Sequence, residues 1–289
     1  QVADLAPLQT VDIAINYAKA AELAAILKSS EGGILSDRGG VTVDERTNTL
    51  LIRDTLESID EARKTIEPSP LKAALLAEKA GAQGITIHLR EDRRHIQDED
   101  VRVVQKGINT RLNLEMAPTQ EMVDLAFEIQ PYQVSLVPEK RQEITTEGGL
   151  DVCSQERALS KIREKMQGKG VLFSLFIDPD LTQVDASQRI QADSIEINTG
   201  KYTELESPKE IERELERIQK SAKRAAEQGL KVFAGHGLNY ENVKAIAAIP
   251  EIEELNIGHF IVGQAIYGGM ENAVTEMIRS IERGRKQRK

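Results

Sequence analysis

The chain has 289 residues, of which 40% are hydrophobic and 29% charged, and its formal net charge is −9 at pH 7. This composition can bury a core and excludes an intrinsically disordered chain. The acidic balance argues against a general nucleic-acid or membrane-surface binder, because both need a basic surface.

Residues 10–67 predict a complete small unit with the order βαββα. The expected strands are 11–17, 39–45 and 48–54, and the expected helices are 18–28 and 56–66. The turn Arg46-Thr47-Asn48 has residues typical of a hairpin. The run VDERTNTLLIRDT (43–55), followed by a helix with Ile59 and Ala62, resembles the small N-domains of secretins, which are outer-membrane channels. This resemblance covers nearly all of residues 1–67 and implies contact with secretion-system proteins.

From residue 70 onward, short runs of Val, Ile and Leu alternate with longer amphipathic stretches, as parallel strands covered by helices require. We expect helices at 71–82, 121–130, 208–229 and 272–286. The strand runs are 85–90, 111–116, 132–138, 171–178, 194–200, 231–237 and 254–263.

Seven such units predict an α/β fold, a (β/α)8 TIM barrel that lacks its first strand. The candidate for that strand is 49–54, which the N-terminal unit also needs. We therefore predict two domains, 1–67 and 68–289, joined at a segment that contains Pro68 and Pro70. The first barrel strand is expected to be replaced or contested between them.

All four histidines fall in a predicted strand or in the loop just after it. They are His88, His95, His236 and His259. Glu115 and Glu196 interrupt apolar strands, where an unpaired carboxylate would be costly. Because the strand ends of a parallel barrel converge on one face, these groups predict an active site there.

Glycine-rich turns follow the last two strands, in 235–237 and 258–269, and can present backbone N–H groups to a phosphate. The long loop 137–149 carries Lys140, Arg141, Thr145 and Thr146, and it is either a solvated loop or a lid over an anionic substrate. No spacing indicates a metal site. Acid–base chemistry on phosphorylated small molecules, without a bound cofactor, is the reading that the residues support.

Several long runs in residues 68–282 together resemble the pyridoxine 5′-phosphate synthase family. They are GITIHLREDRRHI, NLEMAPTQEM, LVPEKRQEITTEGGLDV, SLFIDPD, GLKVFAGHGLNYENV and ELNIGHFIVG. The resemblance implies condensation of 3-amino-2-oxopropyl phosphate with 1-deoxy-D-xylulose 5-phosphate, releasing inorganic phosphate and water. It also implies no metal or organic cofactor, a cytoplasmic address and a homo-octamer.

The same resemblance implies roles for individual residues. His88 would be the general base, Glu115 a proton shuttle and His236 the general acid. Glu196 would stabilise charge in the transition state. The residues implied for the deoxyxylulose phosphate are Arg90, His95 and Thr145, and those for the phosphate of the amino ketone are Gly237, Gly258 and His259.

The family's first strand carries an Asn-Ile-Asp-His run and then an arginine, both of which touch substrate. A gapless comparison places this run on residues 52–55 and the arginine on Arg63, so that Asp54 and Arg63 match while the Asn and His do not. A second departure is Asn198-Thr199-Gly200, where the family has His-Thr-Gly. The departure in the first strand implies a synthase whose turnover is impaired, whereas the change at Asn198 carries no predicted effect.

Two other interpretations remain open at this level. The chain is either an assembly module whose secretin-like part docks to pilus components, with a non-catalytic oligomeric barrel, or an artificial join of two proteins. The first would require a periplasmic address. The start of the chain lacks the basic and apolar regions of a signal peptide, and no run of about 20 apolar residues could span a bilayer. We therefore expect no membrane insertion.

Overall fold

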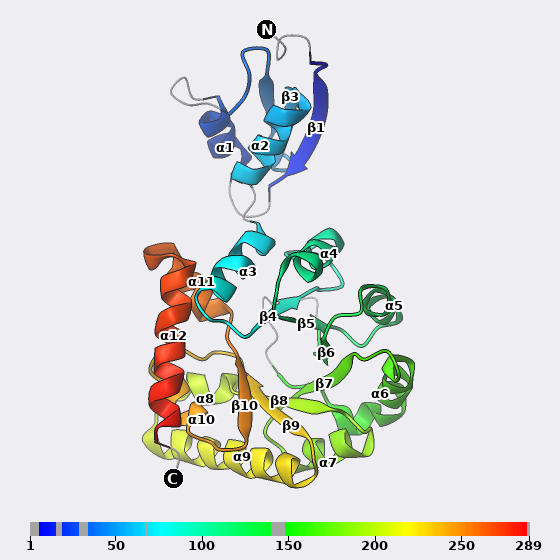
Figure 1. The fold of residues 1–289 in the computed structure, drawn as a ribbon, viewed down its shortest axis with the longest axis vertical. Coiled ribbons are helices and arrows are strands. Elements are labelled where there is room, and N and C mark those ends of the chain that lie inside the picture. The colour runs from blue at the N-terminus through cyan, green and yellow to red at the C-terminus, as the bar shows by residue number, and fades with distance from the viewer. Residues whose placement is uncertain (1–5, 16–18, 29–33, 67–68, 140–147, 288–289) are drawn as a thin grey trace. The chain divides into compact units, whose positions relative to one another are not determined.

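The computed structural model describes residues 6–15, 19–28, 34–66, 69–139 and 148–287. The chain forms two compact units, Gln1–Lys72 and Ala73–Lys289 (Figure 1). The first unit contains an antiparallel sheet, and the second contains a curled parallel sheet with helices outside it. This is the α/β architecture with an additional α+β unit that the sequence predicts.

The N-terminal unit has the predicted βαββα order. Its elements are β1 (Gln9–Ala14), α1 (Ala20–Leu27), β2 (Gly40–Asp44), β3 (Thr49–Asp54) and α2 (Leu56–Ile66). Alternate side chains of β3 point into the core, where Leu50 and Ile52 are buried together with Ile59 of α2. The hairpin turn before β3 ends at Asn48, which has a left-handed φ of 51°.

Strand β3 is the central strand of the N-terminal sheet. The strand order is β1-β3-β2, and Ile52 is paired with Val11 on one side and Val41 on the other, both antiparallel. Both edges of the β3 backbone are therefore used within this sheet. The segment 49–54, which the sequence leaves contested, belongs to the N-terminal sheet.

The second unit contains seven parallel strands in chain order from β4 to β10. They are β4 (Gly84–His88), β5 (Arg111–Met116), β6 (Gln133–Leu136), β7 (Leu172–Ile177), β8 (Ser194–Asn198), β9 (Lys231–Gly235) and β10 (Ile252–Asn256). Strands β6 and β8 are buried along their whole length, because helices cover one side of the sheet and its own curl covers the other.

Helices connect the strands on the outside of the curl. They are α3 (Pro70–Lys79), α4 (Asp98–Gly107), α5 (Gln120–Ile129), α6 (Val152–Met166), α7 (Leu181–Arg189), α8 (Gly200–Glu204), α9 (Pro208–Glu227), α10 (Val243–Ala247), α11 (His259–Gly268) and α12 (Met270–Arg285). Helix α9 shows how the sequence sets such bounds: Pro208 occupies its first turn, and Gly229, just beyond its end, has φ 82°. Its apolar stripe, with Ile218 and Ala222, is buried.

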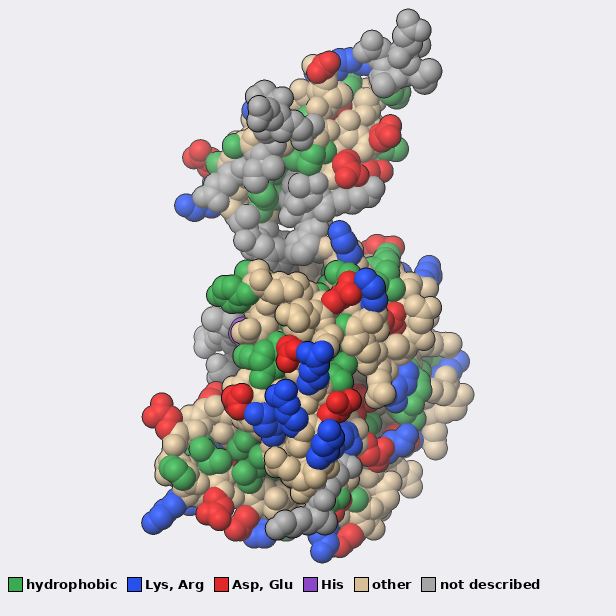
Figure 2. Space-filling model, turned by 60° about the vertical axis from the view of Figure 1, so that its left-hand side comes forward, with side chains coloured by type: hydrophobic (Ala, Val, Ile, Leu, Met, Phe, Trp, Pro, Cys, Tyr) green, Lys and Arg blue, Asp and Glu red, His purple; other side chains and the backbone are tan. Residues whose placement is uncertain are grey.

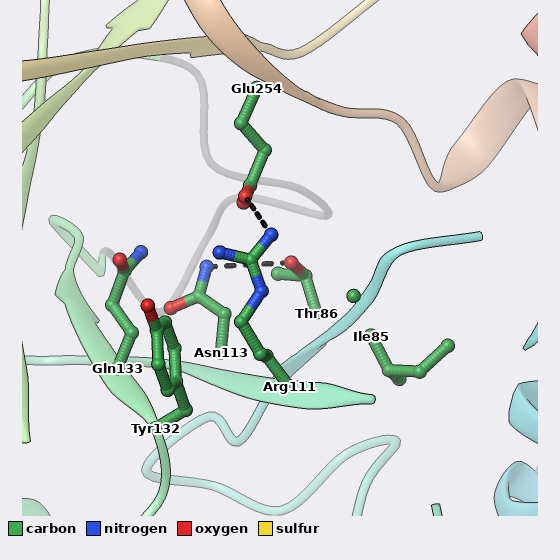
Figure 3. Close-up of a pocket in the computed structure, with 8 residues that line it drawn as sticks. Ile85, Thr86, Arg111, Asn113, Tyr132, Gln133 and Glu254 are labelled. Carbon is green, nitrogen blue, oxygen red and sulfur yellow. Dashed lines mark hydrogen bonds and ion pairs between the residues drawn. The ribbon is translucent and has the colours of Figure 1, made fainter. Parts of the chain in front are cut away.

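The edge strands β4 and β10 are not paired with each other in the sheet order of the described residues. Side chains bridge them instead. Thr86 Oγ1 donates to Asn256 Oδ1 at 3.1 Å. From the next strand, Arg111 of β5 also reaches β10: its Nη2 lies 3.1 Å from Glu254 Oε2, and its guanidinium lies over the ring of Tyr132 (Figure 3). The barrel is thus a seven-stranded sheet whose seam is spanned by polar side chains.

One predicted strand extends too far. The apolar run 254–263 suggests a single strand, but β10 ends at Asn256 and α11 begins at His259. Gly258 forms the N-cap of α11. Because short apolar runs have no distinctive period, they do not separate a strand from a helix start.

Charged side chains of both signs are mixed over the molecular face in Figure 2. The ion pairs of the second unit, such as Arg224–Asp185 and Arg102–Glu128, also join opposite charges between neighbouring helices. None of the helices that can be described is long and apolar enough to cross a bilayer.

Candidate active site

The chemistry-bearing side chains lie at or near the carboxyl ends of the parallel strands. His88 is the last residue of β4, and in the β4–β5 register it is paired with Glu115. His236 follows β9 directly, and Glu196 lies on the neighbouring strand β8. One histidine–carboxylate pair thus comes from β4 and β5, and the other comes from β8 and β9. Both pairs lie toward the carboxyl ends of the strands, where barrel enzymes have their active sites.

His88 lies between two carboxylates. Its Nδ1 is 3.8 Å from Glu115 Oε2, and its Nε2 is 3.0 Å from Glu139 Oε1. The first distance is too long for a direct hydrogen bond, and the second is a good one. The His88 and Glu115 side chains are 21% and 22% exposed, so a substrate can reach them.

Glu115 and Glu196 are acids held in surroundings that disfavour their charge. Burial raises the pKa of Glu115, and the nearby His88 partly offsets the effect. Burial also raises the pKa of Glu196 well above its usual value, and the Glu115 charge raises it further. The Asn256 amide donates to Glu196 Oε2 at 2.7 Å and opposes this shift. Both acids thus keep their protons to a higher pH than an exposed glutamate does.

His236 stands on a strained turn with φ 82°, in the left-handed region that residues other than glycine seldom adopt. Thr199 holds this turn, because its hydroxyl donates to the carbonyls of Gly235 at 2.7 Å and His236 at 2.6 Å. A side chain at Gly200 would stand only 2.8 Å from His236 Cδ2, so glycine is needed there. Burial lowers the pKa of His236; the Glu204 charge opposes this, and His259 adds to it.

The expected phosphate side of the site consists of exposed backbone. Gly237 has φ 74°, and a Cβ there would meet the Thr203 side chain, so only glycine fits. Gly258 and His259, both exposed, form the N-terminus of the ten-residue helix α11. Helix N-termini with free N–H groups attract anions.

The residues expected to hold the second phosphate are only partly described. Arg90 is buried with 4% of its surface exposed, and its Nε lies 3.7 Å from Asp92 Oδ1. His95 is exposed in the same loop. Thr145, together with Lys140, Arg141 and Thr146, lies outside the described residues.

Asp54 and Arg63 lie in the N-terminal unit. Asp54 is fully buried, and its carboxylate accepts hydrogen bonds from the backbone N–H groups of Ser36 and Thr55, both at 2.7 Å, and from the Ser36 hydroxyl. These contacts give Asp54 a structural task within its own unit. Arg63 is exposed on α2. A substrate contact by either residue stays a prediction.

Asn198, which departs from the family pattern, organises the rim. Its side chain donates to Asp178 Oδ1 at 2.8 Å and accepts the Gly200 N–H at 2.9 Å. Asp178 Oδ1 also accepts the Gly149 N–H at 3.0 Å. The amide thus links the ends of β7 and β8 with the segment that enters α6.

Two residues of the site escape the sequence analysis. Glu139 lies in the charged loop after β6, next to Lys140 and Arg141, which the sequence analysis names instead. Its side chain is only 5% exposed and contacts His88. Asn256 ends β10 and binds Glu196. Asn256 is a polar residue at the carboxyl end of a strand, and this is the signal that would have found it; Glu139 lies three residues beyond the end of β6 and carries no such signal. In the described part of the chain, no three His, Cys, Asp or Glu side chains gather as metal ligands would.

Comparison with known proteins identifies the second unit. A family model described as pyridoxal phosphate biosynthesis protein PdxJ matches residues 54–283. The chain belongs to the PdxJ family. A pyridoxine 5′-phosphate synthase from Sulfurihydrogenibium sp. (strain YO3AOP1) is 55% identical over 237 residues, which cover 81% of this chain and 97% of that protein. The synthase from Synechococcus sp. (strain JA-2-3B'a(2-13)) is 51% identical over 224 residues, or 78% of this chain and 94% of its own.

Solved structures show the fold of the PdxJ unit. A 4-hydroxy-2-oxoglutarate aldolase/2-deydro-3-deoxyphosphogluconate aldolase from TTHB1 aligns with a TM-score of 0.52 at 14% identity, over 74% of this chain and 89% of that one. The Amycolatopsis orientalis BexX/CysO complex aligns with a TM-score of 0.52 at 13% identity, over 75% and 85%. At such identities the likeness concerns the fold alone.

A second family model, described as the bacterial type II/III secretion system short domain, matches residues 13–67. It overlaps the PdxJ match over residues 54–67. The PdxJ match begins at Asp54, the last residue of β3, and continues through α2. Strand β3 is thus almost wholly outside the PdxJ match, in keeping with its place in the N-terminal sheet.

Proposed function

We propose that this chain is a pyridoxine 5′-phosphate synthase. It would condense 3-amino-2-oxopropyl phosphate with 1-deoxy-D-xylulose 5-phosphate and release inorganic phosphate and water. Relatives with this name, 51–55% identical over nearly their whole length, support the proposal. The observation that carries it is the arrangement of His88, Glu115, Glu196 and His236 near one end of the parallel sheet.

His88 acts as the general base in this proposal, and Glu115 shuttles its proton. A condensation of two carbonyl compounds requires proton removal from carbon and from nitrogen, and histidine suits this task because its pKa lies near the working pH. The 3.8 Å separation of His88 Nδ1 from Glu115 Oε2 leaves this nitrogen without a direct hydrogen bond to that carboxyl, so that it can meet a substrate. The raised pKa of Glu115 suits it to carrying a proton between steps.

His236 acts as the general acid, protonating oxygen as water leaves, and Glu196 stabilises developing negative charge. A protonated Glu196 can donate a hydrogen bond, and its raised pKa supports that form. Thr199 holds the strained turn at His236, so the direction of the imidazole is fixed before substrate binds. The chemistry requires no metal or organic cofactor, because acid–base groups suffice for every step.

Phosphate binding follows the backbone features of the site. We assign the phosphate of the amino ketone to Gly237, Gly258 and His259, where the N-terminus of α11 lies. The deoxyxylulose phosphate is assigned to Arg90, His95 and Thr145. Asp54 and Arg63 stay candidates for substrate contact by resemblance. Ile52 and Thr55 stand where the family has Asn and His, and this departure leads us to expect slower turnover than in the relatives.

Phosphate release on mixing both substrates with the full chain tests this function. Replacing His236 with alanine should lower the rate by about 10²- to 10⁴-fold, because one general acid contributes that much. The matched control is Lys106→Ala, an exposed position on α4, which should leave the rate unchanged. Equal release by the wild type and the His236→Ala variant would rule out the proposed role of His236.

The N-terminal unit supports a second, separate activity. Its match to the secretion-system short domain and its βαββα order favour docking of residues 1–67 to secretion-system proteins. Pull-down of such proteins by the full chain, with a chain lacking residues 1–48 as control, tests this role. Capture that does not depend on the N-terminal residues would exclude it.

Three further features complete the proposal. We place the functional boundary between residues 67 and 68, although the compact units meet at Lys72 and Ala73. We expect a homo-oligomer, an octamer by family resemblance. We expect a cytoplasmic address for the synthase, with a periplasmic address only where the secretin-like segment directs the chain.

A further inference from the structure

Glu139 has no role in the chemistry described so far, although it makes the shortest contact to His88. Its Oε1 lies 3.0 Å from His88 Nε2, and its Oε2 accepts the backbone N–H of Glu91 at 3.1 Å. The Glu139 side chain is only 5% exposed. Both oxygens are therefore engaged, and the carboxylate cannot turn away from the imidazole.

We propose that Glu139 is a positioning residue that holds the proton of His88 on Nε2 and leaves Nδ1 as the nitrogen that accepts a proton from substrate. This inference rests on the proposed role of His88 as the general base. It assigns to Glu139 the task that an orienting carboxylate performs beside other catalytic histidines, which is to fix the tautomer and the ring direction.

The charge state of the two carboxylates decides which nitrogen carries the proton. Burial alone would raise the pKa of Glu139, but the hydrogen bonds from His88 and from the Glu91 N–H, aided by the charges of His88 and Arg90, bring it below its usual value. An ionised carboxylate only accepts hydrogen bonds, so Nε2 must donate. Glu115, whose pKa burial raises, faces Nδ1 at 3.8 Å and makes no direct bond to it.

The position of Nδ1 agrees with this assignment. Glu115 comes from β5 and Glu139 from the end of β6, so the two acids approach the ring from neighbouring strands. Arg90, two residues after His88, is the further charged group acting on Glu139. Nδ1 thus faces a proton shuttle, whereas Nε2 faces a fixed anion.

Nuclear magnetic resonance of the substrate-free full chain tests the tautomer directly. With only four histidines in the sequence, ¹⁵N-labelled imidazoles can be assigned, and His88→Gln identifies the signal of interest. We expect a sharp downfield Nε2–H proton for His88, shielded from exchange by Glu139. In Glu139→Ala this proton should exchange with water and disappear, while Glu91→Gln, which retains the backbone donor, should keep it. Persistence of the signal in Glu139→Ala would overturn the proposal.

Kinetics separate positioning from a structural role. In Glu139→Gln the amide oxygen can still accept the Glu91 N–H, so the local backbone is kept, but the fixed negative charge beside Nε2 is lost. We expect kcat to fall at least about 10-fold, a part of what a general base contributes, with KM changed less than about 3-fold and thermal stability near that of the wild type. An unchanged kcat in this variant would also overturn the proposal. If the wild type itself makes no product, the proposed function fails, while the resonance experiment still decides the role of Glu139.

Discussion

Single residues in this site are defined by what surrounds them rather than by their type. Glu115 of β5 and Glu196 of β8 are both glutamates of the same curled sheet, and burial raises the pKa of each. Glu139 is a third glutamate, and hydrogen bonds lower its pKa. One residue type thus supplies two carboxyls with a raised pKa and one with a lowered pKa, a division set by the local contacts.

Removal of the buried charge at Glu196 should stabilise the fold. In the folded chain the pKa of Glu196 is raised above its usual value of 4.5, so the folded state binds more protons than the unfolded state between these two pKa values. Wild-type stability therefore falls as pH rises from about 4.5 through the folded pKa. The Glu196→Gln variant has no carboxyl to ionise at this position. Its free energy of unfolding at neutral pH should therefore exceed that of the wild type by on the order of 1 kcal/mol.

Thermal unfolding of both proteins at pH 5 and pH 8 measures this effect. The difference in Tm between Glu196→Gln and wild type should grow with pH. A difference that shrinks as pH rises would show that the Glu196 carboxylate is stabilised by its charge, contrary to the site described above.

At the scale of elements, the strand ends are held by close backbone contacts. A Cβ at Gly235, the last residue of β9, would collide with the Glu196 carboxylate and stand 2.7 Å from the Asn256 carbonyl oxygen. Gly84, the first residue of β4, has only an ordinary 3.5 Å neighbour, the Arg111 carbonyl oxygen. Close packing at Gly235 therefore aligns β8, β9 and β10 around Glu196.

Gly235→Ala should destabilise the chain by about 1–3 kcal/mol, because over-packing forces neighbours to move. Gly84→Ala, as the matched control in a strand, should change the free energy of unfolding far less. Denaturant unfolding of the two variants measures both values. Equal losses would mean that the contact around Glu196 is not tight.

The sequence predicts the order of the strands well, because alternating apolar runs and amphipathic stretches carry clear periods. Residues 56–66 are predicted and observed as one helix. The helix start at His259 is missed, because the apolar run continues across Gly258 without a change of pattern. Glu139 is missed because burial depends on packing between β4 and β6 and leaves no local trace.

On the scale of the molecule, helix α11 exposes large apolar side chains to solvent. Helix α11 has no buried residue among those described, and Val262, Ile266 and Tyr267 are 56%, 81% and 87% exposed. Large exposed apolar patches on soluble proteins commonly mark protein contacts. This surface supports the proposed homo-oligomer.

Sedimentation of Ile266→Asp tests that contact. A charge at this position should shift the chain toward smaller species at equal concentration, because desolvating it within an interface costs several kcal/mol. Leu181 is an exposed apolar residue on a different helix, α7, and Leu181→Asp serves as the control. It should leave the distribution of oligomer sizes unchanged. The same sedimentation profile in wild type and Ile266→Asp would remove α11 from the interface.

The central claim is that a PdxJ barrel with strand 49–54 in another sheet still joins the two substrates. Mass spectrometry of the product formed by the full chain tests it most directly, with His88→Gln alongside. We predict that pyridoxine 5′-phosphate accumulates with the wild type, more slowly than with the relatives, and that His88→Gln forms at least about 10²-fold less. Binding of both substrates without any product from the wild type would contradict the account.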